Sequence, residues 1–142
     1  MRMAPDFELP DLSGEPWKLS YALKDGPVLL VFFKISCPTC QLTLPFLERF
    51  DSPQVVAISQ DDAGGTRGFG TKLRTVLDTP RTYPVSNAYG ITHVPALFLV
   101  ETDSRISDAG YGFSKADLQK LGARFGVAPF HPGEHVPDLR PG

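Results

Sequence analysis

Two cysteines stand two residues apart in the segment Cys37-Pro38-Thr39-Cys40, and they are the only cysteines in the chain. The pair directly follows the apolar run at 28–33, so a strand is expected to deliver a dithiol to the start of a helix. At a helix start, backbone N–H groups and the positive end of the helix dipole stabilise a thiolate, the reactive form of cysteine. The pattern predicts thiol–disulfide exchange, in which Cys37 attacks a disulfide and Cys40 resolves the mixed disulfide.

Two other uses of a Cys-x-x-Cys pair compete with this prediction. Tetrahedral zinc needs two further ligands at short spacing, but the three histidines, His93, His131 and His135, form no second pair of that kind, and the last two lie in a proline-rich segment. Two buried structural cysteines are the other possibility. Pro38 argues against it, because proline suits the first turn of a helix and so favours a helix start at Cys37.

Composition indicates one ordinary globular domain. The chain has 142 residues, of which 42% are hydrophobic and 21% charged, with a formal net charge of −2. That charge gives no reason to expect a nucleic acid or an anionic membrane as partner. Since no apolar stretch reaches the length of a membrane span and the first residues do not resemble a signal peptide, we expect a cytoplasmic protein. A periplasmic or extracytoplasmic location would follow if a signal sequence has been removed, and we expect a monomer.

Strands and helices are expected to alternate along the chain. Continuous apolar runs predict buried strands at 28–33, 54–59 and 95–100, and a return strand is expected at 105–109. The first predicted helix runs from Pro38 to about Phe50, and a loop is expected at 61–65. A second helix is predicted through Phe69, Leu73 and Val76, ending just before Pro80. A third is predicted from Ser114 to about Phe125. We assign residues 1–126 to one domain and residues 127–142, with their four prolines, to an extended surface tail.

The order and spacing of several short segments resemble the thioredoxin superfamily, in particular its TlpA-like branch, which neighbours the alkyl hydroperoxide reductase (AhpC/TSA) and peroxiredoxin group. The segments lie within residues 4–126 and are Ala4-Pro5-Asp6-Phe7-Glu8-Leu9, Cys37-Pro38-Thr39-Cys40 with Pro45, Val55-Val56-Ala57-Ile58-Ser59 and Tyr89-Gly90-Ile91-Thr92-His93-Val94-Pro95-Ala96-Leu97-Phe98-Leu99-Val100. The resemblance implies an α/β thioredoxin-like fold, with a central mixed sheet flanked by helices. It also implies an N-terminal extension and a TlpA-type insertion from Asp61 to Val85.

The same resemblance implies a substrate groove beside the dithiol. Val94–Pro95 would be a cis peptide bond facing the two cysteines, and the backbone of Val94 would pair with an incoming peptide or disulfide partner. Pro38 and Thr39 would line the other side of the groove. The expected partners are protein or small-molecule disulfides and thiols, together with an upstream thiol reductant. No cofactor is expected beyond the redox-active disulfide of Cys37 and Cys40.

Some positions depart from the family pattern. Val31 stands where thioredoxin carries a buried aspartate, and Thr43 stands where many TlpA-like proteins carry a glutamate, although those acids help to move the proton of the resolving thiol. Water, another residue or slower chemistry must therefore replace them. Peroxiredoxins place a threonine three residues before the peroxide-attacking cysteine, and Lys34 occupies that position here.

Lys34 and His93 are two further candidates near the dithiol. Lys34 lies three residues before Cys37, where its ammonium group would favour the thiolate unless it extends into solvent. Cys37, Cys40 and His93 are the ligand types that soft copper prefers. The alternative functions are therefore a peroxiredoxin-like peroxidase and a copper-binding chaperone of the Sco type, although Sco-type chaperones usually space their cysteines three apart.

Overall fold

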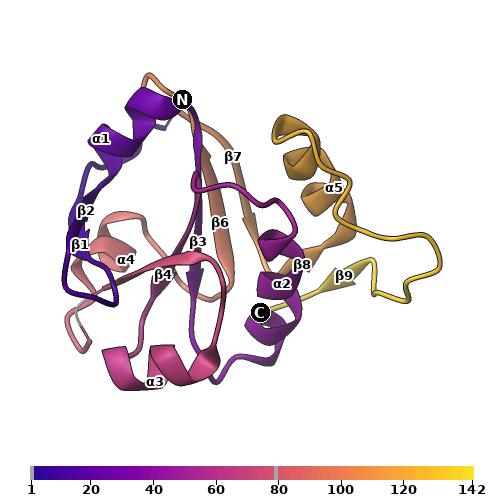
Figure 1. Ribbon diagram of the computed structural model, residues 1–142, viewed down its shortest axis with the longest axis horizontal. Coiled ribbons are helices and arrows are strands. Elements are labelled where there is room, and N and C mark those ends of the chain that lie inside the picture. The colour runs from indigo at the N-terminus through magenta and orange to yellow at the C-terminus, as the bar shows by residue number, and fades with distance from the viewer. Residues whose placement is uncertain (1, 79) are drawn as a thin grey trace.

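A central sheet of five strands organises the chain, in the order β5-β4-β3-β6-β7 (Figure 1). The computed structural model describes residues 2–78 and 80–142. The five strands are β3 (Val28–Phe33), β4 (Val55–Ser59), β5 (Arg74–Leu77), β6 (Ala96–Val100) and β7 (Ile106–Tyr111). β3 pairs in parallel with β4 and antiparallel with β6, so the predicted mixed sheet is confirmed.

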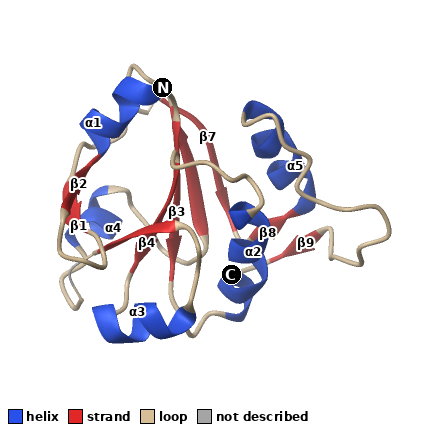
Figure 2. Ribbon diagram, viewed as in Figure 1, coloured by secondary structure: helices blue, strands red, loops and turns tan. Residues whose placement is uncertain are grey.

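Helices and short strands cover both faces of this sheet (Figure 2). On one side lie a hairpin of β1 (Glu8–Pro10) and β2 (Pro16–Lys18), then α1 (Leu19–Ala22), the short 3₁₀ helix η1 (Leu23–Asp25) and α4 (Pro84–Ala88). On the other side lie α2 (Pro38–Glu48), α3 (Ala63–Phe69) and α5 (Lys115–Arg124), with β8 (Phe113–Ser114) and β9 (Leu139–Arg140) beside them. Within residues 2–78 and 80–142, no helix is long and apolar enough to cross a membrane.

Side chains of β3 alternate between two hydrophobic cores, as the period of a strand requires. Leu30 and Phe32 pack with Tyr89 under the N-terminal hairpin. Leu29, Val31 and Phe33 pack on the opposite face, in the core that also contains Cys40, Leu44 and Leu47 of α2. Every residue of β3 is buried, because the strand lies between β4 and β6 and is covered on both faces.

The predicted helix through Phe69, Leu73 and Val76 is wrong. α3 begins at Ala63, inside the expected loop, and Gly70 ends it in the left-handed conformation with φ of 76°. The next segment is the edge strand β5, in which Val76 pairs with Ile58 of β4. The apolar spacing had the period of a helix, but a glycine that ends the helix and the adjacent β-branched pair Thr75-Val76 favour a strand instead.

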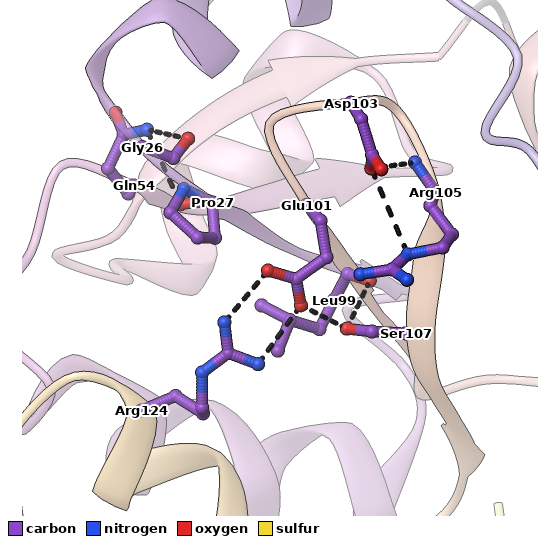
Figure 3. A network of polar contacts seen from close by, with 9 residues as sticks. All are labelled: Gly26, Pro27, Gln54, Leu99, Glu101, Asp103, Arg105, Ser107 and Arg124. Carbon is purple, nitrogen blue, oxygen red and sulfur yellow. Dashed lines mark hydrogen bonds and ion pairs between the residues drawn. The ribbon is translucent and has the colours of Figure 1, made fainter.

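Polar contacts fix α5 to the end of β6. Figure 3 shows Arg124 of α5 donating to both oxygens of Glu101, with distances of 2.8 and 3.0 Å. Ser107 of β7 donates to the same carboxylate. The hydrogen bonds from Arg124 lower the pKa of Glu101, so the carboxylate stays charged in this pair.

Residues 127–142 leave α5, loop outward and return to the body of the protein (Figure 1). β9 in this tail pairs antiparallel with β8. Phe130 packs on Phe46 of α2 with ring centroids 4.8 Å apart, and Arg49 binds Glu134 through two hydrogen bonds of 2.7 and 2.8 Å. The expected surface tail is thus held against β8 by strand pairing and against α2 by aromatic packing and an ion pair.

We expect Phe130→Ala to lower the free energy of unfolding by roughly 2 kcal/mol, about half of the loss typical of a fully buried phenylalanine, because its ring is only partly buried. Urea denaturation of the reduced protein measures this change. Leu139→Ala is the matched control, since the Leu139 side chain is 75% exposed. A loss for Phe130→Ala as small as that of the control would show that the ring does not hold the tail.

Candidate active site

Helix α2 begins at Cys37, as predicted. Cys37 is the N-cap residue, with extended φ and ψ of −84° and 115°, and Pro38 occupies the first turn. The backbone amide of Cys40 donates a hydrogen bond of 3.2 Å to Cys37 Sγ. Such a bond satisfies one of the amides left without a partner at a helix start, and it stabilises negative charge on the sulfur.

The two cysteines lie in different environments. Both are free thiols, but Cys37 is partly exposed whereas Cys40 is completely buried. Burial raises the pKa of Cys40 well above its usual range, and the hydrogen bond and charge of Cys37 raise it further. Cys37 is therefore the cysteine nearer to solvent, while Cys40 is kept as a protonated thiol beneath it.

The residues predicted to form the groove meet at this helix start. The Val94–Pro95 peptide bond is cis, as the family resemblance implied. The Cys37 thiol donates a long hydrogen bond of 3.6 Å to Val94 O. Pro38 is exposed, whereas Thr39 is only 4% exposed, and its hydroxyl donates to Pro141 O of the tail at 2.7 Å.

Lys34 and His93 lie to one side of the cysteines. The Lys34 side chain is exposed and lines a polar hollow that also includes Gln60 and His93. The His93 ring stacks on Tyr111, with ring centroids 4.4 Å apart, and its Nδ1 hydrogen-bonds the Thr92 hydroxyl. Across the described part of the chain, no three His, Cys, Asp or Glu residues converge as metal ligands.

No carboxylate occupies the two positions where the family often has one. Val31 is fully buried in the core that contains Cys40. Thr43 is buried as well, and its hydroxyl donates to Thr39 O at 2.7 Å, which satisfies it within the helix. The proton of Cys40 therefore has no acceptor at either position.

Asp61 is a site residue that the sequence analysis missed. Its carboxylate accepts a hydrogen bond of 2.8 Å from Ile35 N, in the loop between β3 and α2. After burial and the influence of Cys37, the negative charge of Asp61 also raises the pKa of Cys40. A signal was present, because β3 and β4 were both predicted as buried strands, and the carboxyl ends of adjacent parallel strands meet at one edge of a sheet.

The AhpC/TSA family model matches residues 1–109, which include both cysteines and the Val94–Pro95 loop. The chain belongs to the AhpC/TSA family. Among curated proteins, the thiol-disulfide oxidoreductase ResA of Geobacillus thermodenitrificans is 28% identical over 129 residues, which cover 82% of this chain and 72% of ResA.

Solved structures identify the fold. The thioredoxin domain of the thiol-disulfide oxidoreductase BVU-2223 from Bacteroides vulgatus superposes with a TM-score of 0.70 at 20% identity, covering 87% of this chain and 95% of that domain. The peroxidoxin BcpB from Mycobacterium tuberculosis gives a TM-score of 0.68 at 23% identity, covering 87% and 93% of the two chains. The predicted thioredoxin-like fold is confirmed.

We expect Asp61→Asn to lower the pKa of Cys40, because the substitution removes a negative charge that favours the protonated thiol. The measurement is the ultraviolet absorbance of the thiolate against pH in a Cys37→Ala background, where Cys40 is the single thiol. Asn keeps an oxygen that accepts from Ile35 N. Asp62→Asn serves as the control, since Asp62 caps α3. A pKa that is unchanged or higher in Asp61→Asn would exclude the charge effect.

Proposed function

We propose that this protein is a thiol–disulfide oxidoreductase in which Cys37 is the attacking thiol and Cys40 the resolving thiol. The observation that supports these roles best is their unequal environment. Cys37 is partly exposed at a helix start and accepts the amide hydrogen bond of Cys40, whereas the Cys40 side chain is buried. The names of ResA and of the Bacteroides vulgatus domain support the same reaction class.

The reaction transfers two electrons from the dithiol to a substrate disulfide. The Cys37 thiolate attacks one substrate sulfur, which forms a mixed disulfide and releases the other sulfur as a thiolate. Cys40 then loses its proton and attacks Cys37 Sγ, which releases the second substrate thiolate and leaves a Cys37–Cys40 disulfide. A thiol reductant returns the protein to the dithiol form, so the redox group is the cysteine pair itself.

Loss of the Cys40 proton is the demanding part of this cycle. Burial raises the pKa of the thiol, and neither Val31 nor Thr43 supplies a base. We assign the proton to Asp61, which is held at the neighbouring strand end by Ile35 N and whose charge acts on Cys40. Burial, and to a smaller extent the charge of Asp61, favour the protonated Cys40 thiol before the mixed disulfide forms, and Asp61 is the acceptor that we propose for the proton afterwards.

Cys40→Ala should accumulate mixed disulfides between Cys37 and its partners, because nothing inside the protein can then release them. Cys37→Ala should trap few or none, since the remaining thiol is buried. The measurement is capture from a cell extract, followed by release with dithiothreitol and identification of the released proteins. Equal or stronger trapping by Cys37→Ala would reverse the two roles.

Reduction of insulin and of glutathione disulfide by the unsubstituted protein, supplied with a thiol reductant, tests the reaction class. Peroxide consumption, measured in parallel, tests the peroxidase alternative that the peroxidoxin relative represents. Turnover of peroxide without turnover of either disulfide would replace the proposed function by a peroxidase.

A further inference from the structure

Residues 139–142 of the tail reach the groove beside the dithiol. β9 pairs with β8, which brings the following residues alongside the first turn of α2. Thr39, inside the Cys37-Pro38-Thr39-Cys40 segment, donates its hydroxyl hydrogen to Pro141 O at 2.7 Å. In Figure 1 the C-terminal end of the chain lies beside α2. One wall of the predicted substrate groove is thus already bonded to a segment of this same chain.

The tail also contacts the opposite wall of the groove. A Cβ atom added to Gly142 would lie 1.8 Å from Val94 O and 2.7 Å from Val94 C, so the backbone of Gly142 packs directly on this carbonyl group. Val94 O is also the acceptor for the Cys37 thiol at 3.6 Å. Only glycine fits at this position, because any side chain would overlap the Val94 backbone.

A separate set of contacts holds the tail upstream of these residues. Arg49 of α2 binds the carboxylate of Glu134 in a bidentate pair and also donates to Pro129 O at 2.8 Å. The Arg49 hydrogen bonds lower the pKa of Glu134 to about 2. Because this anchor is on the helix that carries the dithiol, residues 139–142 remain at high effective concentration beside the groove even when their own contacts open.

We propose that residues 139–142 act as an internal ligand of the groove, and that they must leave before a partner can reach Cys37. The occupant that replaces them is an extended peptide segment of a disulfide-bearing protein, with glycine over Val94 O. This inference rests on the proposed function for the identity of the partner, but the position of the tail against Thr39 and Val94 does not depend on it.

The type of contact determines the class of partner. Thr39 bonds a main-chain carbonyl of the tail, and the approach to Val94 is also made by main-chain atoms. A surface that binds backbone in this way accepts extended peptides of many sequences at the positions other than the glycine over Val94, as strand-addition sites do. A small disulfide without a peptide chain cannot form these contacts and gains little from an open groove.

The decisive variant is Gly142→Ala, whose added Cβ would overlap Val94 and force the end of the tail out of the groove. A chain lacking residues 139–142 is a second opened form, and it keeps the Arg49–Glu134 pair and the Phe130 contact. Gly68→Ala on α3 is the matched control, because a Cβ there meets no atom within 4 Å. Circular dichroism confirms that each variant is folded.

The first readout is the rate at which iodoacetamide alkylates Cys37 in the reduced protein. Both opened forms should react about tenfold faster, the change that corresponds to removing closing contacts worth about 1.4 kcal/mol, while Gly68→Ala should be unchanged. Rates within twofold of the unsubstituted protein in both opened forms would overturn the proposal. Because alkylation needs no disulfide substrate, this result is independent of the proposed function.

The second readout uses the peptide Pro-Asp-Leu-Arg-Pro-Gly, which is the sequence of residues 137–142. Added at millimolar concentration to the shortened chain, it should slow alkylation again, whereas the same peptide ending in alanine should not. Equal effects of the two peptides would contradict a groove specific for glycine. A partner-class test follows from disulfide turnover: opening should accelerate reduction of a peptide disulfide more than reduction of bis(2-hydroxyethyl) disulfide, which has no peptide bond, and equal acceleration would overturn the assignment of an extended peptide.

Discussion

The hydrogen bond from the Cys40 amide to Cys37 Sγ can form only if α2 begins at Cys37, and this start depends on several other parts of the molecule. β3 must end four residues earlier. The position of that end is fixed because the six apolar residues of β3 are enclosed between two strands and two hydrophobic layers. The intervening loop is held by Asp61, which accepts from Ile35 N, and by Gln41, whose side chain donates to Ile35 O. Most of the fold thus acts to hold one sulfur at a helix start.

Local sequence was sufficient to predict these central features. Apolar runs long enough for buried strands gave β3, β4 and β6, and Pro38 beside the cysteines gave the start of α2. The cis bond at Val94–Pro95 came from the family resemblance, because no local property separates it from the other proline positions.

Features set by distant contacts were not predictable in the same way. β5 was mistaken for a helix, because the edge position that β4 offers to Val76 is invisible in the local spacing of apolar residues. The tail was expected to lie on the surface, because its prolines and few apolar residues give no periodic signal, yet Phe130 and Glu134 find partners on α2. Asp61 was overlooked for a related reason, since its effect on the pKa of Cys40 depends on the parallel pairing of two strands.

The family match ends at residue 109, whereas β8, α5 and β9 lie beyond that residue. The contact of Pro141 with Thr39 also depends on a residue beyond the match. The stretch that performs the redox chemistry is therefore separate in the sequence from the stretch that controls which molecules approach it. Mutations in residues 139–142 can alter partner choice during evolution without disturbing the sheet, the cysteines or the buried core. Descendants of one ancestral oxidoreductase could thus diverge in their clients while their catalytic segment stays the same.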